Sequence, residues 1–385
     1  MRDAPPVVLQ QGMWDEYSKI HDLYNVVIRN GIVHFYGLDE QVILEAVDNE
    51  TDTHYWIQPY KHYVSWTQLF EYSSDIFRFH KEPFDWTKCH TIVEEPSFMF
   101  SPWQPFNTYH AHNDNMFPLI VSYLRAGLAG ARKRLYMNLY GGNVVWEQAM
   151  LLVMTALPKL FDFRLWEELT GDTATCFRHF RWGRGPMLWY HSLNGICADP
   201  PTDFWAGSAP AAAQEIYKTF SVTPLLRPGQ WKPMVSGVIT ALYLTRTGAR
   251  SIVNGELVTA ALRRVGIQSY DCCNFGDIPR SLEAMQKADI LWGVHGAGFT
   301  NEVYMPAGGL VVEIRSHSSM PEPIYWTGAK QGGHAYHMHS IREYGESPGG
   351  YTVTPMWAEK FAQEVLRRWT EHIDTPPHLY DRSTY

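Results

Sequence analysis

The sequence lacks the features of a small domain held together by disulfides or zinc. Only five of its 385 residues are cysteine, an odd number, and no pair has C-x-x-C spacing. One disulfide could form among Cys89, Cys176 and Cys197, but the sequence does not select a pair. A hydrophobic core must therefore provide most of the stability, and the chain length and the 45% hydrophobic content allow one.

The sequence also lacks a long apolar run and an excess of positive charge. No segment approaches the length of a membrane-spanning helix, and the first six residues do not resemble a signal peptide. We therefore expect a chain that is soluble as given, with membrane attachment only through an anchor absent from it. The formal net charge of −8 argues against nucleic-acid binding, so an anion site would have to be a local cluster of arginines.

Changes in pattern divide the chain into three parts. Residues 224–233 are rich in proline, break any regular structure and are typical of a linker. We predict an N-terminal domain over residues 1–230, a C-terminal domain over 231–350 and a final helical segment over 351–385. In the first part we expect a hairpin that turns at Asn30-Gly31. A strand and three helices are also expected there, over residues 96–100, 113–128, 144–157 and 210–220.

After the linker, apolar runs typical of buried strands alternate with helical patterns. The expected strands are residues 238–244, 268–272, 290–294, 310–314 and 335–341. Helices are expected after Asn254, Asp277 and Thr354, which are residue types that cap helices well. This alternation predicts an α/β fold, with a parallel sheet and right-handed crossovers.

The loop after the strand at 290–294 has the composition of an anion-binding turn. It contains His295-Gly296-Ala297-Gly298, and we expect Thr300 to cap a short helix that Pro306 ends. A strand that leads through two glycines into a helix start aims backbone N–H groups and the helix dipole at an anion. The same turn differs only slightly from the dinucleotide-binding fingerprint. It also resembles the oxyanion turn of esterases, but the chain has no G-x-S-x-G motif, which an esterase of that kind would need.

Polar side chains follow several of the expected strands, at the sheet edge where ligands bind in such folds. Arg246 and Arg250 come after the first strand of the C-terminal domain, His295 after the third, and Glu313 lies near the end of the fourth. A guanidinium group binds phosphate oxygens bidentately and keeps its charge, so this edge is suited to a diphosphate.

Two histidine clusters offer further chemistry. His110 and Asp114 lie together before the helix at 113–128, and such a pair suits a general base. His337 and His339 share a strand face near His334 and could bind a metal, but no carboxylate partner is in view. We therefore predict no metal site.

Together these residues resemble glycosyltransferase family 61. The resemblance rests on four motifs: Arg246-x-x-x-Arg250-x-x-x-Asn254-x-Glu256, His295-Gly-Ala-Gly-x-Thr-Asn301, Met305-Pro-x-Gly-x-x-Val-Val-Glu313-Ile, and Asn107-x-x-His110-x-x-x-Asp114. They span roughly residues 95–345, and Phe299 stands where the family often has leucine. The resemblance implies a GT-B fold, in which two Rossmann-like domains face a central cleft and the last helix crosses back to the N-terminal domain.

The resemblance also implies an activity, namely inverting transfer from a UDP-sugar to a glycan or glycoprotein hydroxyl in the Golgi or endoplasmic reticulum lumen. It implies no prosthetic group, and the chain has no D-x-D pair to hold a metal. Asp114 or His110 would be the base. The donor would contact Arg246, Arg250, Asn254, His295, Gly296, Ala297, Gly298, Thr300, Asn301 and Glu313.

Two other functions remain open at the level of sequence. One is a catalytically inactive family member that binds glycans, and the other is an unrelated nucleotide-dependent oxidoreductase. The sequence does not fix the sugar (GlcNAc, xylose or arabinose), the acceptor, the linkage or the oligomeric state.

Overall fold

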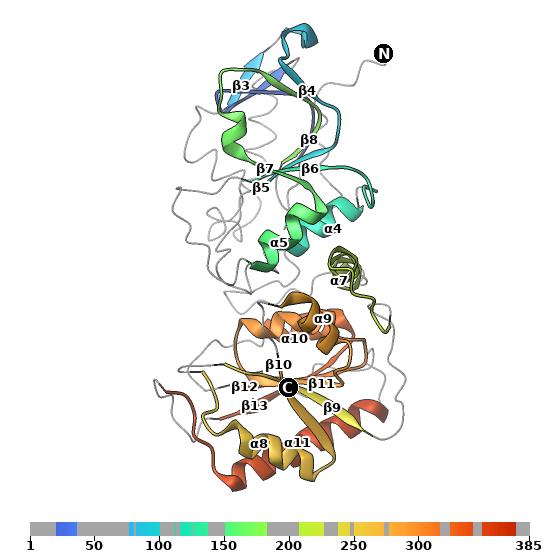
Figure 1. Cartoon of the computed structure of the whole chain (residues 1–385), viewed down its shortest axis with the longest axis vertical. Helices are drawn as coiled ribbons and strands as arrows, with labels where there is room; N and C mark the ends of the chain where they lie inside the picture. Colours follow the sequence, from blue (N-terminus) through green and yellow to red (C-terminus); the bar gives the residue numbers. More distant parts are fainter. Residues whose placement is uncertain are drawn as a thin grey trace, which may run out of the picture. The chain divides into compact units, whose positions relative to one another are not determined.

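The computed structural model describes residues 21–36, 77–80, 82–100, 112, 116–125, 127–137, 151–182, 208–226, 238–246, 250–272, 277–315, 324–341 and 349–374. The chain divides into two compact units, each with its own sheet (Figure 1). The first unit comprises Met1–Phe106, Asp114–Glu147 and Val153–Met187, and the second comprises Asn107–Asn113, Gln148–Leu152 and Leu188–Tyr385. The second unit thus takes in residues 188–230, which we had expected in the first domain. Helices combined with parallel strands confirm the α/β class.

The first unit is built on an eight-stranded mixed sheet. Seven strands follow the order β3-β2-β1-β8-β5-β6-β7, and β4 pairs with β8. The strands are β1 His21–Arg29, β2 Ile32–Tyr36, β3 Phe77–His80, β4 Thr91–Val93, β5 Ser97–Phe100, β6 Arg134–Met137, β7 Asp162–Leu165 and β8 Thr175–Trp182. The helices are η3 Trp86–Lys88, α4 Phe117–Arg125, α5 Leu151–Leu160 and η6 Trp166–Leu169.

Two local features of this sheet connect directly to the sequence. The predicted hairpin is confirmed, because β1 and β2 pair and both turn residues, Asn30 and Gly31, have positive φ of 54° and 69°. Cys89 and Cys176 form a disulfide with a Cα–Cα distance of 5.8 Å, which joins the residues before β4 to β8. The sequence had left this pairing open.

The second unit contains a five-stranded, wholly parallel sheet in the order β10-β9-β11-β12-β13. All five strands lie where the sequence predicted them: β9 Ile239–Leu244, β10 Ile267–Cys272, β11 Ile290–Val294, β12 Leu310–Arg315 and β13 Ala335–Ser340. Its helices are α7 Ser208–Thr219, α8 Gly255–Arg264, α9 Ile278–Met285, η7 Ala297–Tyr304, α10 Ile324–Gly332 and α11 Pro355–Asp374. In Figure 1, α8 and α11 cover one face of the sheet, and α9 and α10 cover the other.

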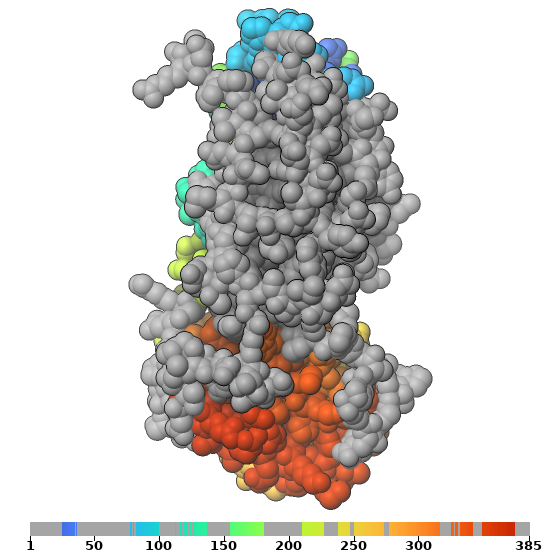
Figure 2. All heavy atoms as spheres, turned by 180° about the vertical axis from the view of Figure 1, so that it is seen from behind, coloured from blue at the N-terminus to red at the C-terminus, as the bar shows by residue number. Residues whose placement is uncertain are grey.

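The central strands of this sheet are buried on both faces, which explains their unbroken apolar sequences. Trp292 of β11 stacks on Tyr243 of β9 at a ring separation of 4.2 Å, and its indole N–H donates to Ser269 Oγ over 3.0 Å. Phe361 and Trp369 of α11 pack into the same core. Residues of α11, red in Figure 2, also form part of the surface of this unit.

Helix α7 also belongs to the second unit. The Tyr217 hydroxyl donates to the Tyr304 carbonyl of η7 over 2.8 Å, and the Gln286 amide donates to that hydroxyl over 2.6 Å. These buried contacts hold α7 against the segment that follows β11. Among the helices described here, none combines the length and hydropathy needed to cross a membrane.

The strand order determines where a ligand would bind. Strand β9 lies between β10, which follows it in the chain, and β11, so the connections that leave β9 and β10 run in opposite directions along the sheet. At such a topological switch point the loops diverge and leave a crevice beyond the carboxyl ends of the strands. Here the switch point lies between the ends of β9 and β11.

Candidate functional site

Arg246 and the loop after β11 meet at this switch point. Arg246 Nη1 donates a hydrogen bond to the His295 carbonyl oxygen over 2.8 Å. A Cβ atom on Gly296 would lie 1.4 Å from Arg246 Nη1. Gly296 has a φ of 164°, which any residue can adopt, so glycine is needed here only for the close approach of the guanidinium. The sequence predicted that another group would come close to the backbone at this turn, and in the structure the Arg246 guanidinium does so.

Arg246 contacts this loop, and Arg250 lies close enough for its charge to act on Arg246. Burial lowers the pKa of Arg246, and the nearby charge of Arg250 lowers it further. Within the described part of the chain, neither guanidinium forms an ion pair with a carboxylate. A partly buried cation beside a second cation is an unfavourable arrangement that a bound anion would relieve.

A buried carboxylate, that of Glu313, holds the first residue of the loop by a hydrogen bond to His295. Glu313 of β12 is 0% exposed, hydrogen-bonds to His295 Nδ1 through one oxygen and accepts from the Tyr336 hydroxyl through the other. The Arg315 Nε lies 3.5 Å from the same carboxylate. Glu313 therefore cannot touch a ligand directly. It fixes the His295 ring, so that Nε2 is the ring nitrogen that a ligand can use.

Tyr325 of α10 completes the wall of this site. Its ring lies 5.6 Å from the His295 ring and 5.2 Å from the Phe299 ring, and the side chain is buried. Burial is the largest cause of its raised pKa, to which Glu313 also contributes, while the two arginines oppose the shift. Sequence reasoning missed Tyr325, because no pattern in the sequence predicted α10.

Two of the predicted donor contacts, Thr300 and Asn301, form hydrogen bonds within the loop. Thr300 does not cap η7, which starts after Gly296; its hydroxyl donates to the Ala297 carbonyl over 2.7 Å. The Asn301 amide donates to the Gly298 carbonyl over 2.7 Å, and both side chains are buried. Their contacts stabilise the turn that presents Ala297 and Gly298.

Asn254 precedes α8 as predicted, but its side chain makes no capping hydrogen bond. Its amide nitrogen donates to the Val353 carbonyl over 2.8 Å, and its oxygen accepts from the Val353 N–H over 3.0 Å. These bonds occupy both ends of the amide and tie the start of α8 to the segment before α11. By contrast, Asp277 caps α9 and Thr354 caps α11, both as predicted.

Glu302 is a second buried acid, on η7 directly after the loop. Its side chain is fully buried, and neither carboxyl oxygen has a hydrogen-bond partner. Burial raises the pKa of Glu302 well above its ordinary value, and the charge of Glu313 raises it further. The backbone carbonyl of Glu302 accepts from His334 Nε2 over 3.1 Å. Burial and the charge of Glu313 therefore both favour the neutral form of Glu302.

The two histidines of β13, His337 and His339, have ring centroids 6.0 Å apart and also contact α11. His337 Nε2 lies 3.7 Å from Glu364 of α11, and burial, followed by the charge of Arg368, lowers the pKa of His337 to about 4. The His339 ring packs against the aromatic side chains of α11. In the part of the chain that the structure describes, no three histidine, cysteine or acidic residues converge on a metal-sized site.

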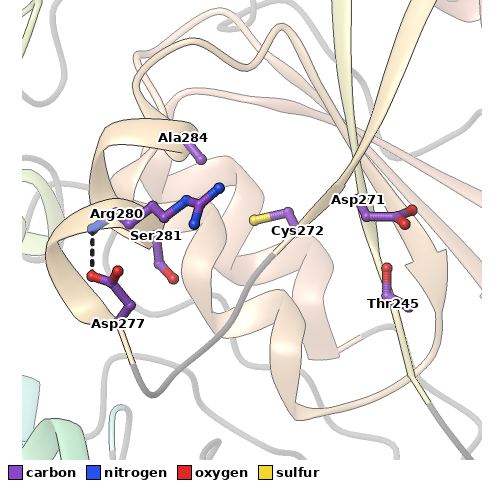
Figure 3. A pocket seen from close by; sticks show the side chains of 7 residues that line it. All are labelled: Thr245, Asp271, Cys272, Asp277, Arg280, Ser281 and Ala284. Atoms are coloured by element: carbon purple, nitrogen blue, oxygen red, sulfur yellow. Dashed lines mark hydrogen bonds between the residues drawn. The ribbon is translucent and has the colours of Figure 1, made fainter.

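A pocket of about 440 Å³ opens next to Arg246 at the same edge of the sheet. Its lining comes from the end of β9, the end of β10 and the first turns of α9: Thr245, Asp271, Cys272, Asp277, Arg280, Ser281 and Ala284. In Figure 3, Thr245 and Asp271 lie on one side of Cys272 and Arg280 lies on the other. Sequence reasoning did not find this pocket.

His110 and Asp114 fall outside the residues that the structure describes, so their role stays a prediction. The neighbouring His112 is described; it is buried, and its ring lies 6.2 Å from that of Tyr304.

Comparison with known proteins agrees with the motifs. The family model described as Glycosyltransferase 61 matches residues 89–312, more than half of the chain. One curated relative, the beta-1,2-xylosyltransferase XAX1 of Oryza sativa subsp. japonica, is 37% identical over 73 residues. That match covers 19% of this chain and 13% of the relative, so it spans only a small part of each protein. The family match contains Arg246, Arg250 and the His295-Gly296 turn, and the chain belongs to the glycosyltransferase 61 family.

Proposed function

We propose that this chain transfers a sugar from a UDP-sugar to a hydroxyl group of a glycan or glycoprotein, with inversion at the anomeric carbon. The observation that carries the proposal is the pair Arg246 and Arg250, which have no carboxylate partner among the described residues and lie at the switch point of a parallel sheet. Such a pair favours a bound anion, and a diphosphate presents several oxygens to two guanidinium groups.

The proposed donor lies with its diphosphate between Arg246 and the first N–H groups of η7, which are not used within the helix. In the reaction, the acceptor oxygen attacks the anomeric carbon, the bond to the diphosphate breaks, and a base takes the hydroxyl proton. Fixed cations stabilise the negative charge that develops on the departing UDP. His295, oriented by Glu313, is in position to add a hydrogen bond to the same group. This arrangement requires no metal ion.

The remaining parts of the proposal rest on family membership. Asp114 or His110 serves as the base, and the two units act as the two domains of a GT-B enzyme. The Golgi or endoplasmic reticulum lumen is the proposed location. The Cys89–Cys176 disulfide supports it, because such cross-links form and persist in oxidising compartments.

Two rival functions make different predictions. An inactive glycan-binding member would bind a glycan without releasing UDP, and a nucleotide-dependent oxidoreductase would be stabilised by NAD instead of UDP. Thermal-shift measurements with UDP, UDP-GlcNAc, UDP-xylose, UDP-arabinose and NAD therefore separate the oxidoreductase from the transferase, and also select a donor.

The decisive assay measures UDP release in EDTA, with the selected donor and a panel of oligosaccharide acceptors. Wild type should release UDP in an acceptor-dependent manner, and Arg246→Ala should lose most of that activity. Arg263→Ala is a matched control, because Arg263 also donates to a backbone carbonyl, that of Ser269, over 3.3 Å, but from the last turn of α8. Equal activity of the two variants would refute the role of Arg246.

A further inference from the structure

Glu302 is a buried acid that the proposed mechanism does not use. It lies on η7, and its side chain is 0% exposed, so it cannot touch a ligand. Among the residues that the structure describes, no group forms a hydrogen bond with either of its carboxyl oxygens. A carboxylate without a hydrogen bond or a cation is costly in a protein interior, whereas the neutral acid costs less. The protonation of Glu302 therefore determines whether the middle of η7 contains a negative charge.

The surroundings of Glu302 favour its neutral form. Burial is the largest cause that raises its pKa, and the charge of the buried Glu313 of β12 is the second. Among the described groups, no cation opposes these two effects. His334 donates to the Glu302 carbonyl and stays neutral, because burial lowers its pKa to about 4. The other ionisable groups on or beside the packed elements are the buried Tyr217 of α7, Tyr325 of α10 and Tyr336 of β13, the ion pair Glu215–Lys218 of α7, and the exposed Arg280 and Glu283 of α9.

Glu302 also lies close to the proposed diphosphate position. The first N–H groups of η7 face the diphosphate, and Glu302 is the sixth residue of this element. At about 2.0 Å per residue, Glu302 is therefore roughly 10 Å further along the same 3-10 helix. Tyr325 senses both parts of the site: after burial, the largest cause, its pKa responds to the charges of Glu313, Glu302, Arg246 and Arg250. An ionised Glu302 would therefore reduce the positive potential that attracts the anion.

We propose that UDP binds to the form of the chain in which Glu302 is protonated, so that this acid couples donor binding to pH without touching the donor. The inference rests on the proposed function and adds a pH dependence to the same site. Where Glu302 is ionised, UDP binding requires the carboxylate to take one proton from solvent and form one O–H bond. By reciprocity, the negative charge of bound UDP favours this protonation by the same factor. UDP affinity should therefore be highest where Glu302 is neutral and fall as pH rises through its titration.

The test measures UDP affinity by calorimetry from about pH 6 to about pH 9 in wild type and in Glu302→Gln, which has the shape of the neutral acid. The two proteins should bind UDP equally at the low end. As pH rises, wild type should become roughly tenfold weaker than the variant, as expected for one charge acting over about 10 Å of protein. The ratio of the two affinities cancels the titration of UDP and of His295, which both proteins share. Glu283→Gln removes an exposed acid of α9 and should keep the wild-type profile.

A proton count checks the same coupling independently. Titrations in buffers of different ionisation enthalpy give the number of protons taken up when UDP binds. Wherever the two affinities diverge with pH, this number should be larger for wild type than for Glu302→Gln. Glu302→Met, an uncharged side chain of similar length, provides the same comparison if the amide variant does not fold.

The outcomes separate the coupling from the proposed function. An affinity ratio between wild type and the uncharged variant that stays constant over the whole pH range would overturn the coupling. Equal proton uptake by the two proteins would overturn it as well. Failure of wild type to bind UDP at any pH would refute the proposed function itself, so the two failures are distinguishable.

Discussion

Gly296→Ala should disable the diphosphate site through Arg246. The new Cβ would lie 1.4 Å from Arg246 Nη1 and 2.6 Å from its Cζ, whereas non-bonded atoms need about 3.5–4.0 Å. The guanidinium must therefore leave the loop, losing both its bond to the His295 carbonyl and its contact with phosphate. A hydrogen bond to a charged group contributes about 1.5–3 kcal/mol, so UDP affinity should fall about 10- to 150-fold.

The same loop supplies the control. A Cβ on Gly298 would meet Leu244 at 3.6 Å, an ordinary contact, and the backbone N–H proposed to face the donor is kept, so Gly298→Ala should weaken UDP binding much less than Gly296→Ala. Calorimetry of UDP binding to both folded variants makes the comparison. Because the glycine acts through Arg246, Gly296→Ala should add little in an Arg246→Ala background. If Gly296→Ala binds UDP as tightly as Gly298→Ala, the close approach has no functional role.

Four further results are expected. Transfer activity should persist in EDTA, and complete loss that Mn²⁺ restores would show a metal requirement. Asp114→Asn and His110→Ala each remove one candidate base. The variant that removes the true base should lower turnover by about 10²–10⁴-fold and leave UDP affinity unchanged. Normal turnover in both variants would mean that another residue is the base. Replacing Cys89 and Cys176 by serine removes a cross-link over 87 residues and should lower unfolding stability by about 4–5 kcal/mol, measured by denaturant titration at equilibrium. The raised pKa of Glu302 lets the folded chain keep a proton that the unfolded chain releases above about pH 4.3, so this group makes the fold less stable as pH rises. The unfolding free energy of Glu302→Gln relative to that of wild type should therefore grow by up to about 1.4 kcal/mol per pH unit. A difference that does not depend on pH would contradict the burial argument.

The parallel sheet of the second unit could be predicted because its signals are local. Strands β11 and β12 are apolar runs buried on both faces, Asp277 caps α9, which follows β10, and Thr354 caps α11. The carboxyl-edge rule then placed Arg246 and His295 together, and their 2.8 Å contact confirms that placement. The hydrophobic periodicity and the rule for parallel sheets were therefore sufficient to predict the sheet and the contact between Arg246 and His295.

Features that depend on long-range packing were not predictable. Strand β8 mixes arginine, histidine and tryptophan, so its pattern does not indicate a central strand, although it pairs with β1, β4 and β5. Glu313 looked like a ligand contact, because the sequence does not reveal that Tyr336 and His295 enclose it. The predicted helix caps at Thr300 and Asn254 are wrong for a similar reason: their side chains bind other backbone groups, whose positions only the fold determines.

The central claim is that an arginine-lined edge of the second unit binds the diphosphate of a nucleotide-sugar without a metal. Calorimetric titration of UDP into wild type and Arg246→Ala, both in EDTA, tests it most directly. We predict a single UDP site in wild type and at least about tenfold weaker binding in the variant, from the loss of a charge-assisted contact. Absence of UDP binding to wild type, or equal affinity in the folded variant, would contradict the claim.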